Sequence, residues 1–281
     1  MGLTRNQVVI VAILLAGATL VVLNQTLLSP AYPSIMADLQ ADATTVQWLT
    51  SAYSLVEAIV IPLSAFLIGR FPTRKLFIAG VSVFALGSLM AAFSPFFGIL
   101  LLGRIFQAAA TGVVMPMVFT VILLIFPREK RGSAMGIVSL VIGFAPAVGP
   151  SLSGLLVESV GWRSLFMLVT ALAVLIVILA IVLLKSYGEF EPTSFDKPSV
   201  ALCSLGLLGL LYGLATITSA TNIAIPIALI VAGAILLTFF VRRQLRLEVP
   251  LLKVDVLKSR SYAIVVVLVA LLQAALVGTG V

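Results

Sequence analysis

Apolar runs of about twenty residues recur along the whole chain, and no other feature constrains its fold as strongly. A helix rises about 1.5 Å per residue, so a run of this length crosses the ~30 Å hydrocarbon core of a bilayer. Only 10% of the residues are charged, whereas soluble domains carry about 25%. We therefore expect an all-α fold, a polytopic transmembrane helical bundle with about nine spanning helices. The expected spans are 7–28, 44–68, 76–93, 96–126, 132–157, 163–184, 199–218, 222–241 and 262–281.

The basic residues lie in the connectors on one side of the membrane. When the N-terminus is placed inside, all of the 17 Lys and Arg residues except Arg104 and Arg163 fall in or beside inner connectors. Lys and Arg concentrate in cytoplasmic loops, so we expect a multi-pass plasma-membrane protein with a cytoplasmic N-terminus. This placement directs the net charge of +7 towards lipid headgroups and argues against nucleic acid as a partner.

Several kinds of chemistry are excluded by residue types that the chain lacks. It contains no histidine and a single cysteine, Cys203, so we expect no metal site, no histidine acid–base chemistry and no intrachain disulfide. It also has no Gly-x-Ser-x-Gly nucleophile elbow and no Gly-x-x-x-x-Gly-Lys nucleotide-binding loop. We therefore expect no cofactor, no enzymatic activity and no drive by ATP within this chain.

The stretch 132–157 combines the length of a span with repeated helix breakers. It carries no charge from Gly132 to Leu156. Gly and Pro cost about 1 and 3 kcal/mol in a helix interior in water, but in lipid the backbone must stay hydrogen-bonded. We therefore expect a helix that bends at proline and lets a neighbouring backbone approach at glycine. A purely structural, kinked helix is the alternative to a functional motif. The residues concerned are Gly143, Pro146, Gly149, Pro150 and Gly154.

The second half of this stretch, Gly149-Pro150-x-x-Ser153-Gly154 with Gly143 before it, resembles a known motif. It is similar to the helix 5 antiporter motif, Gly-x-x-x-Gly-Pro-x-x-Gly-Gly, of exporters in the major facilitator superfamily. Five residues instead of three separate the first two glycines, and Ser153 replaces the first glycine of the closing pair. In that family the motif marks export against a proton gradient, so the resemblance implies a gating role for this helix.

Two further stretches resemble motifs of the fourteen-helix drug:proton branch of that superfamily. The end of the first span has Asn24 where the family carries an acid in its Leu-Asp-x-Thr pattern. The turn after the second span keeps the basic residues of the family's loop 2–3 motif, while Gly69 replaces the aspartate that helps to latch the inward face. Positive-inside anchoring explains these basic residues equally well. They are Arg70, Arg74 and Lys75.

The fourth span resembles the family's helix 4 motif, Leu-x-x-x-Arg-x-x-Gln-Gly, through Arg104 and Gln107. Arg104, Thr111 and Met115 recur at three- to four-residue spacing when Ala108 is counted, so they share one helix face that we predict to line a cavity. Glu57 is the only one of the 10 acids predicted at membrane depth, where a carboxylate is costly. We expect Glu57 to carry the coupling proton, with Arg104 within reach of it or of Asn24. A structural buried ion pair is the alternative. The predicted substrate cavity comprises Asn24, Tyr53, Gln107, Thr111 and Met115.

Together these motifs imply a proton-coupled exporter of amphipathic or cationic drugs that works by alternating access. The chain looks most similar to multidrug efflux proteins of Gram-positive bacteria, some of which confer antibiotic resistance. The implied partners are drug-like small molecules, protons and the lipid bilayer. Two alternatives stay open at this stage. The same scaffold could export a lipid, a siderophore or a small metabolite, or the chain could be a non-transporting membrane sensor or assembly protein.

The resemblance also implies that these residues belong to a longer transporter. Superfamily members rock two six-helix bundles about a midplane site, and this chain would supply only one of them in full. Trp162 and Arg163, at the start of the sixth span, match a family pattern and are expected to anchor that helix at the interface. The expected parts are a six-helix bundle (1–186), a cytoplasmic linker (187–198), two linker helices (199–241), a cytoplasmic amphipathic segment (242–261) and the first helix of an incomplete second bundle (262–281).

Overall fold

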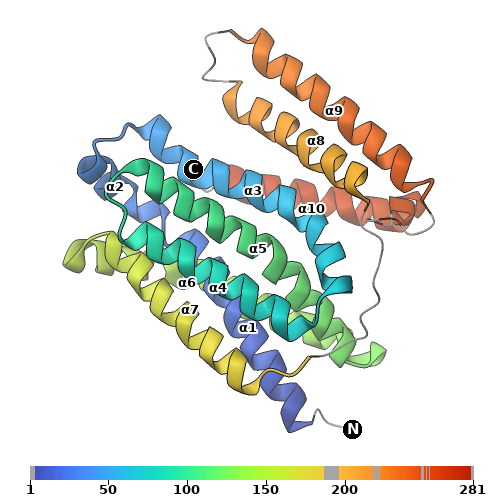
Figure 1. The fold of residues 1–281 in the computed structure, drawn as a ribbon, viewed down its shortest axis with the longest axis horizontal. Helices are drawn as coiled ribbons and strands as arrows, with labels where there is room; N and C mark the ends of the chain where they lie inside the picture. The colour runs from blue at the N-terminus through green and yellow to red at the C-terminus, as the bar shows by residue number, and fades with distance from the viewer. Residues whose placement is uncertain are drawn as a thin grey trace. The chain divides into compact units, whose positions relative to one another are not determined.

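The computed structural model describes residues 4–186, 196–217, 220, 222–247, 250, 252 and 254–279. These residues form α-helices and short 3-10 helices, and no strand occurs among them (Figure 1). In chain order the elements are α1 (Arg5–Thr26), η1 (Ser29–Ala31), α2 (Tyr32–Leu39), α3 (Ala43–Arg70), α4 (Thr73–Ala92), α5 (Phe97–Ile125), η2 (Arg128–Lys130), α6 (Arg131–Val160), α7 (Arg163–Leu183), α8 (Lys197–Thr216), α9 (Ala224–Gln244), η3 (Val254–Lys258) and α10 (Arg260–Thr279).

Eight helical stretches within the described residues are long and apolar enough to cross a membrane. This confirms the expected all-α transmembrane fold. The first of these stretches runs on through α2, so it covers Arg5–Leu39. The ninth expected span, 262–281, is helical as α10, in which the described apolar stretch is Arg260–Leu272.

The connector between α1 and α3 contains helical structure that the pattern of apolar runs does not predict. Pro30 and Pro33 stand in the first turns of η1 and α2, where proline has the right φ and needs no amide donor. Gln40 then ends α2 in the left-handed conformation, with a φ of 48°. The side chain of Asp42 caps α3 by accepting a hydrogen bond of 2.7 Å from the Thr45 amide.

The helix α6 is continuous through both of its prolines, as expected for a backbone that must stay hydrogen-bonded in lipid. It ends at Gly161, whose φ of 94° lies in the region that favours glycine. The next helix, α7, begins two residues later at Arg163. The glycine therefore separates two long apolar helices with a single sharp turn.

The described helices fall into two compact units, α1–α7 and α8–α10. In the first unit, α5 packs against α1, α3 and α4, while α4 also packs on α7, and α1 packs on α6 (Figure 1). Glycines bring α4 and α5 very close, since a Cβ on Gly87 would lie only 2.6 Å from the carbonyl oxygen of Gly103. Because α5 is covered by three helices, the polar side chains in its middle are buried between them.

In the second unit, α8 and α9 form a hairpin whose ends are tied by polar contacts. Arg243 forms a salt bridge of 2.9 Å with Asp196, and the Gln244 amide donates to the Ser199 hydroxyl at 2.6 Å. Hydrogen bonds from Arg243, together with those from Ser199, hold the pKa of Asp196 below its usual range. The five-part division of the chain stays a prediction, and most of its expected linker, 187–198, lies outside the described residues.

Candidate functional site

Polar side chains predicted from different spans meet in the interior of the first unit. Asn24 on α1 and Gln107 on α5 exchange two hydrogen bonds, of 3.2 and 3.4 Å, between their amide groups. Arg104, one turn before Gln107, donates from Nη1 to the same amide oxygen of Gln107 at 2.7 Å. All three side chains are buried, and Arg104 is only 2% exposed. The predicted residues of the first and fourth spans are therefore brought together.

The guanidinium of Arg104 is held from a second side by α3. It lies 4.2 Å from the centroid of the Tyr53 ring, and its Nε donates to the backbone carbonyl of Leu49 at 3.4 Å. A cation over an aromatic face in a desolvated site is stabilised by the ring quadrupole. These contacts offset part of the cost of burying a charge, which is large unless its donors are satisfied.

The hydroxyl groups of Tyr53 and Thr111 lie 2.5 Å apart and extend the same cluster. Thr111 donates its single proton to the Gln107 backbone carbonyl at 2.9 Å, one turn earlier on α5. A hydroxyl has only one proton to donate, so the phenol of Tyr53 is the donor to Thr111. This assignment fixes the direction of the hydrogen bonds between α3 and α5.

Two members of the site were not predicted. Ser88 on α4 accepts a hydrogen bond of 2.7 Å from the Gln107 amide nitrogen and donates to the Phe84 carbonyl at 2.9 Å. Gln25 on α1 donates from Nε2 to the carboxylate of Glu57 at 3.2 Å. Gln25 could have been found as the polar neighbour of Asn24 in the chain. Ser88 carries no such signal, because serines in apolar helices commonly bond the carbonyl of the preceding turn.

Glu57 lies near the middle of α3 and is half-buried. Within the described part of the chain it makes no direct ion pair with Arg104. The guanidinium of Arg104 points to Gln107 and Leu49 instead. The structural ion pair considered as the alternative role for Glu57 is therefore absent here, and the proton-coupling role stays a prediction.

Met115, the last of the predicted cavity residues, lies two turns beyond Gln107 on α5. It is half-buried and packs against the hydrophobic core of the first unit. It thus lies on the same helix as the polar cluster, and its role towards a substrate stays a prediction.

The motif on α6 makes the predicted close approach at only one of its glycines. A Cβ at Gly149 would lie 2.9 Å from the Thr26 Cβ and would overlap the Thr26 hydroxyl, whereas added Cβ atoms at Gly143 and Gly154 meet nothing within 4 Å. Ser153 supports the same contact by donating to the Leu27 carbonyl at 2.6 Å. Pro146 and Pro150 are exposed. The α1–α6 contact is therefore built on Gly149 and Ser153, not on the whole motif.

The basic residues of the loop between α3 and α4 have separate surroundings. Arg74 donates from Nη2 to the Ile181 carbonyl in the last turn of α7 at 2.5 Å, where a cation also meets the negative end of the helix dipole. The guanidinium of Arg70 lies 5.7 Å from the Phe66 ring centroid, and Lys75 is exposed. Arg74 therefore has a packing role in addition to anchoring, which the sequence pattern alone did not indicate.

At the opposite end of the first unit, Arg163 and Trp162 do more than anchor α7. Both donate to the Asp38 carboxylate on α2, Arg163 at 2.5 Å and Trp162 at 3.2 Å. Arg163 also donates to the Ser94 carbonyl, just after α4, at 2.9 Å. This cluster joins α2 and the end of α4 to the start of α7, so that both ends of the bundle carry a polar tie.

Comparison with known proteins agrees with this architecture. The family model described as Major Facilitator Superfamily matches residues 14–278. The chain is 46% identical to the uncharacterized MFS-type transporter YcnB of Bacillus subtilis, over 98% of this chain and 58% of that protein. It is 34% identical to the lincomycin resistance protein LmrB of Listeria monocytogenes, over 92% of this chain and 55% of that protein.

Among solved structures, the fold is similar to the crystal structure of the POT family transporter PepTSo. The TM-score is 0.60 at 15% sequence identity, and the match covers 82% of this chain and 51% of that one. The chain thus spans little more than half the length of the relatives that it matches.

Proposed function

This chain belongs to the major facilitator superfamily. We propose that it supplies one six-helix bundle of a secondary active transporter, together with two linker helices and the first helix of a second bundle. The proposed activity is proton-coupled efflux of amphipathic or cationic drugs by alternating access, in the fourteen-helix drug:proton branch. Similarity to a relative named as a lincomycin resistance protein supports a drug-like substrate. The remainder of the transporter is proposed to lie outside these residues, since the chain covers 58% of YcnB.

The observation that carries the proposal is the position of Glu57. It is close to the centre of the 28-residue helix α3, so it lies about 20 Å from either helix end. Other acids of the spanning stretches, such as Asp38 and Glu158, lie at helix ends. An ionisable residue at membrane depth that forms no ion pair is expected by default to have a functional role.

The surroundings of Glu57 suit competition between a proton and a cationic substrate. Its carboxylate accepts one hydrogen bond from Gln25 on α1, and it is half-buried, so part of its surface is accessible. A bound cation favours the ionised carboxylate, while a bound proton removes the charge that attracts the cation. Movement of α1 relative to α3 would break the Gln25 contact and so change the proton affinity of Glu57 between the two access states.

We also propose the cytoplasm as the location of the N-terminus and a bacterial plasma membrane as the site of action. The basic connectors support the orientation through the positive-inside rule. The relatives named above are bacterial, which supports the source.

The test is uptake of ethidium into everted vesicles that carry the full-length protein and an imposed pH gradient with the lumen acidic, because everted vesicles expose the cytoplasmic face and export is then directed into the lumen. Glu57→Gln keeps the shape and the hydrogen bond but cannot titrate, so it should abolish gradient-driven transport while membrane abundance is unchanged. Glu158→Gln, an exposed acid at the end of α6, is the matched control and should transport like the parent. Equal transport by Glu57→Gln and the parent, with both abolished by a protonophore, would move the proton site elsewhere.

A further inference from the structure

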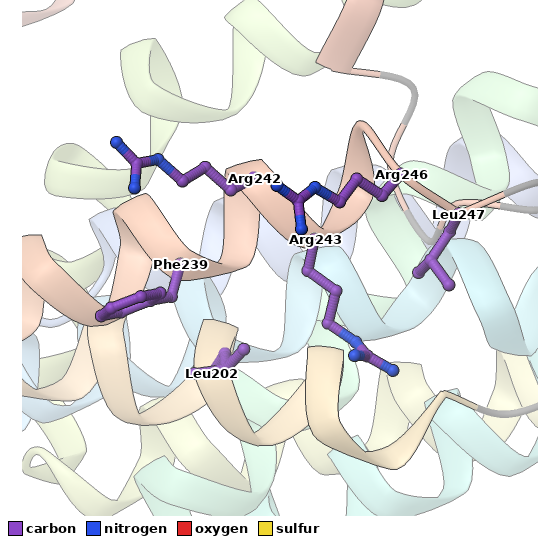
Figure 2. Close-up of a pocket in the computed structure, with 6 residues that line it drawn as sticks. All are labelled: Leu202, Phe239, Arg242, Arg243, Arg246 and Leu247. Atoms are coloured by element: carbon purple, nitrogen blue, oxygen red, sulfur yellow. The ribbon is translucent and has the colours of Figure 1, made fainter.

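Three arginines gather at the end of α9, in the second unit. Arg242, Arg243 and Arg246 line a cavity of about 390 Å³ together with the apolar side chains of Leu202, Phe239 and Leu247 (Figure 2). Guanidinium groups beside apolar surface suit the headgroup and the chain of an amphipathic anion.

The three arginines differ in whether they pair with a carboxylate. Arg243 reaches towards the beginning of α8, where its Nε and Nη2 donate to both oxygens of Asp196 at 2.9 Å (Figure 2). Its charge is thereby neutralised. Arg242 and Arg246 point in a different direction from Arg243, with their guanidinium groups apart from each other, and neither pairs with a carboxylate among the described residues. Even with Glu248 counted, the stretch 242–248 contains three arginines and one acid, so positive charge is left over.

A second, apolar groove lies along the same hairpin. Its volume is about 490 Å³. It exists because the two helices touch through glycines: a Cβ on Gly233 would lie 2.5 Å from the Leu210 amide nitrogen. Backbones this close leave a furrow between the larger side chains on either side. The groove is lined by Leu205, Leu208, Gly209, Tyr212, Leu229, Ala232, Gly233 and Leu236.

Helical spacing joins the groove to the arginine cavity. On α8, Leu202 of the cavity lies three residues from Leu205 of the groove, and on α9 Phe239 lies three residues from Leu236. Residues three apart share a helix face, so the lining is continuous on both helices. From Leu202 to Tyr212 the path follows about 15 Å of helix, which leads from the charged end into the hydrocarbon region.

We propose that this hairpin binds an anionic phospholipid, with the headgroup phosphate between Arg242 and Arg246 and one acyl chain in the groove. Guanidinium groups bind phosphate bidentately, and basic residues at the ends of spanning helices meet the anionic lipid of the cytoplasmic leaflet. A free phosphate would use the arginines alone. The apolar groove along the same hairpin selects the lipid as the source of the anion.

The site is tested by native mass spectrometry of the full-length protein in detergent, titrated with phosphatidylglycerol or with phosphatidylcholine of the same acyl chains. The parent should prefer phosphatidylglycerol by about tenfold, and Arg242→Ala with Arg246→Ala should lose this preference. Arg128→Ala with Arg131→Ala, two arginines of another basic connector, should keep it. Equal binding of the two lipids by the parent would overturn the proposal.

Two further arms separate the headgroup from the chain and guard against misfolding. Ala232→Trp fills the groove and should weaken both lipids, whereas unchanged binding would remove the acyl chain from the proposal. Inorganic phosphate that displaced phosphatidylglycerol at millimolar concentration would show a free-anion site instead. If the double alanine variant fails to fold, Arg242→Lys with Arg246→Lys keeps the charge but loses bidentate geometry, and its preference should fall between those of parent and control.

Discussion

Replacement of Gln107 by leucine is the sharpest test of the buried cluster, because one amide joins three helices. Its oxygen accepts from Arg104 and Asn24, and its nitrogen donates to Asn24 and Ser88. Leucine has a similar size and fits an apolar surrounding, so the substitution removes the hydrogen bonds without opening a large cavity. The guanidinium of Arg104 then loses its best acceptor while it remains buried.

The expected magnitude follows from these contacts. Three of the four bonds join α5 to α1 or α4, and hydrogen bonds between membrane helices contribute about 0.6 kcal/mol each on average, so these three account for about 2 kcal/mol. A buried donor left without a partner adds its desolvation penalty of about 1–3 kcal/mol. Gln107→Leu should therefore lower the free energy of unfolding by about 3–5 kcal/mol. Asn24→Leu, which removes two of the four bonds, should lower it by about 1 kcal/mol.

Reversible unfolding of the full-length protein in mixed detergent micelles measures both values, and the double variant measures their coupling. If Asn24 and Gln107 are bonded as described, the double variant should be about 1 kcal/mol more stable than the sum of the single effects predicts. The control pair is Asn24→Leu with Thr120→Val, since Thr120 bonds only the Pro116 carbonyl of its own helix. Coupling below about 0.5 kcal/mol for Asn24 and Gln107 would refute the network.

Three other outcomes follow from the same structure. Gly149→Leu should abolish efflux by the full-length protein with abundance retained, because its side chain would overlap Thr26, and surviving efflux would contradict the contact. The control Gly143→Leu places its side chain in open space and should leave the unfolding temperature unchanged. The pKa of Asp196 is lowered by Arg243, so its stabilising contribution is complete above its ordinary value of about 3.9 and is lost as the pH falls through the lower folded value. Thermal unfolding scans should therefore show an acid-induced loss below about pH 4 that is smaller in Asp196→Asn. Residues 1–281 expressed alone in cells without the transporter should not restore ethidium efflux, and restored efflux would show that one bundle is sufficient.

The spans could be predicted from the sequence because lipid leaves the backbone few choices. A run of twenty apolar residues must be helical in a bilayer, even through Pro146 and Pro150. The short helix α2 could not be predicted in the same way, since its eight residues form no span. It depends on proline at its start and on its tie to α7 through Asp38.

Most members of the polar cluster were predictable, with Ser88 the exception, but their pairing was not. Spacing along a helix predicts the depth of a side chain in the membrane, and it predicts similar depths for Asn24, Glu57 and Arg104. Depth does not give the rotation of a helix about its axis. This rotation decides which side chain of similar depth becomes the hydrogen-bond partner. Arg104 bonds Gln107 on its own helix, and Glu57 bonds Gln25 on α1. Only the packing of α1, α3 and α5 together determines this choice.

Glycines on α6 show a similar limit. The sequence marks every glycine as a place where another helix can come close, because none has a side chain. Whether one does so depends on a partner of the right shape, and in the first unit Thr26 meets Gly149 alone among the motif glycines Gly143, Gly149 and Gly154. The sequence therefore predicts where a close approach between helices is sterically possible. Whether the contact forms depends on the position of the neighbouring helix.

The hydrogen-bonding capacity that the buried side chains have already used decides which groups can bind a substrate. The Gln107 amide accepts two hydrogen bonds and donates two, so none of its capacity is spare. Thr111 donates its only proton and accepts one bond from Tyr53, which leaves one acceptor lone pair on its hydroxyl. A ligand that hydrogen-bonded to Gln107 would have to break a buried bond, at a cost of about 1–3 kcal/mol. Glu57 is half-buried and receives one bond, from Gln25. We therefore expect the cluster to hold the helices together and Glu57 to be the group on which a proton and a cationic substrate compete.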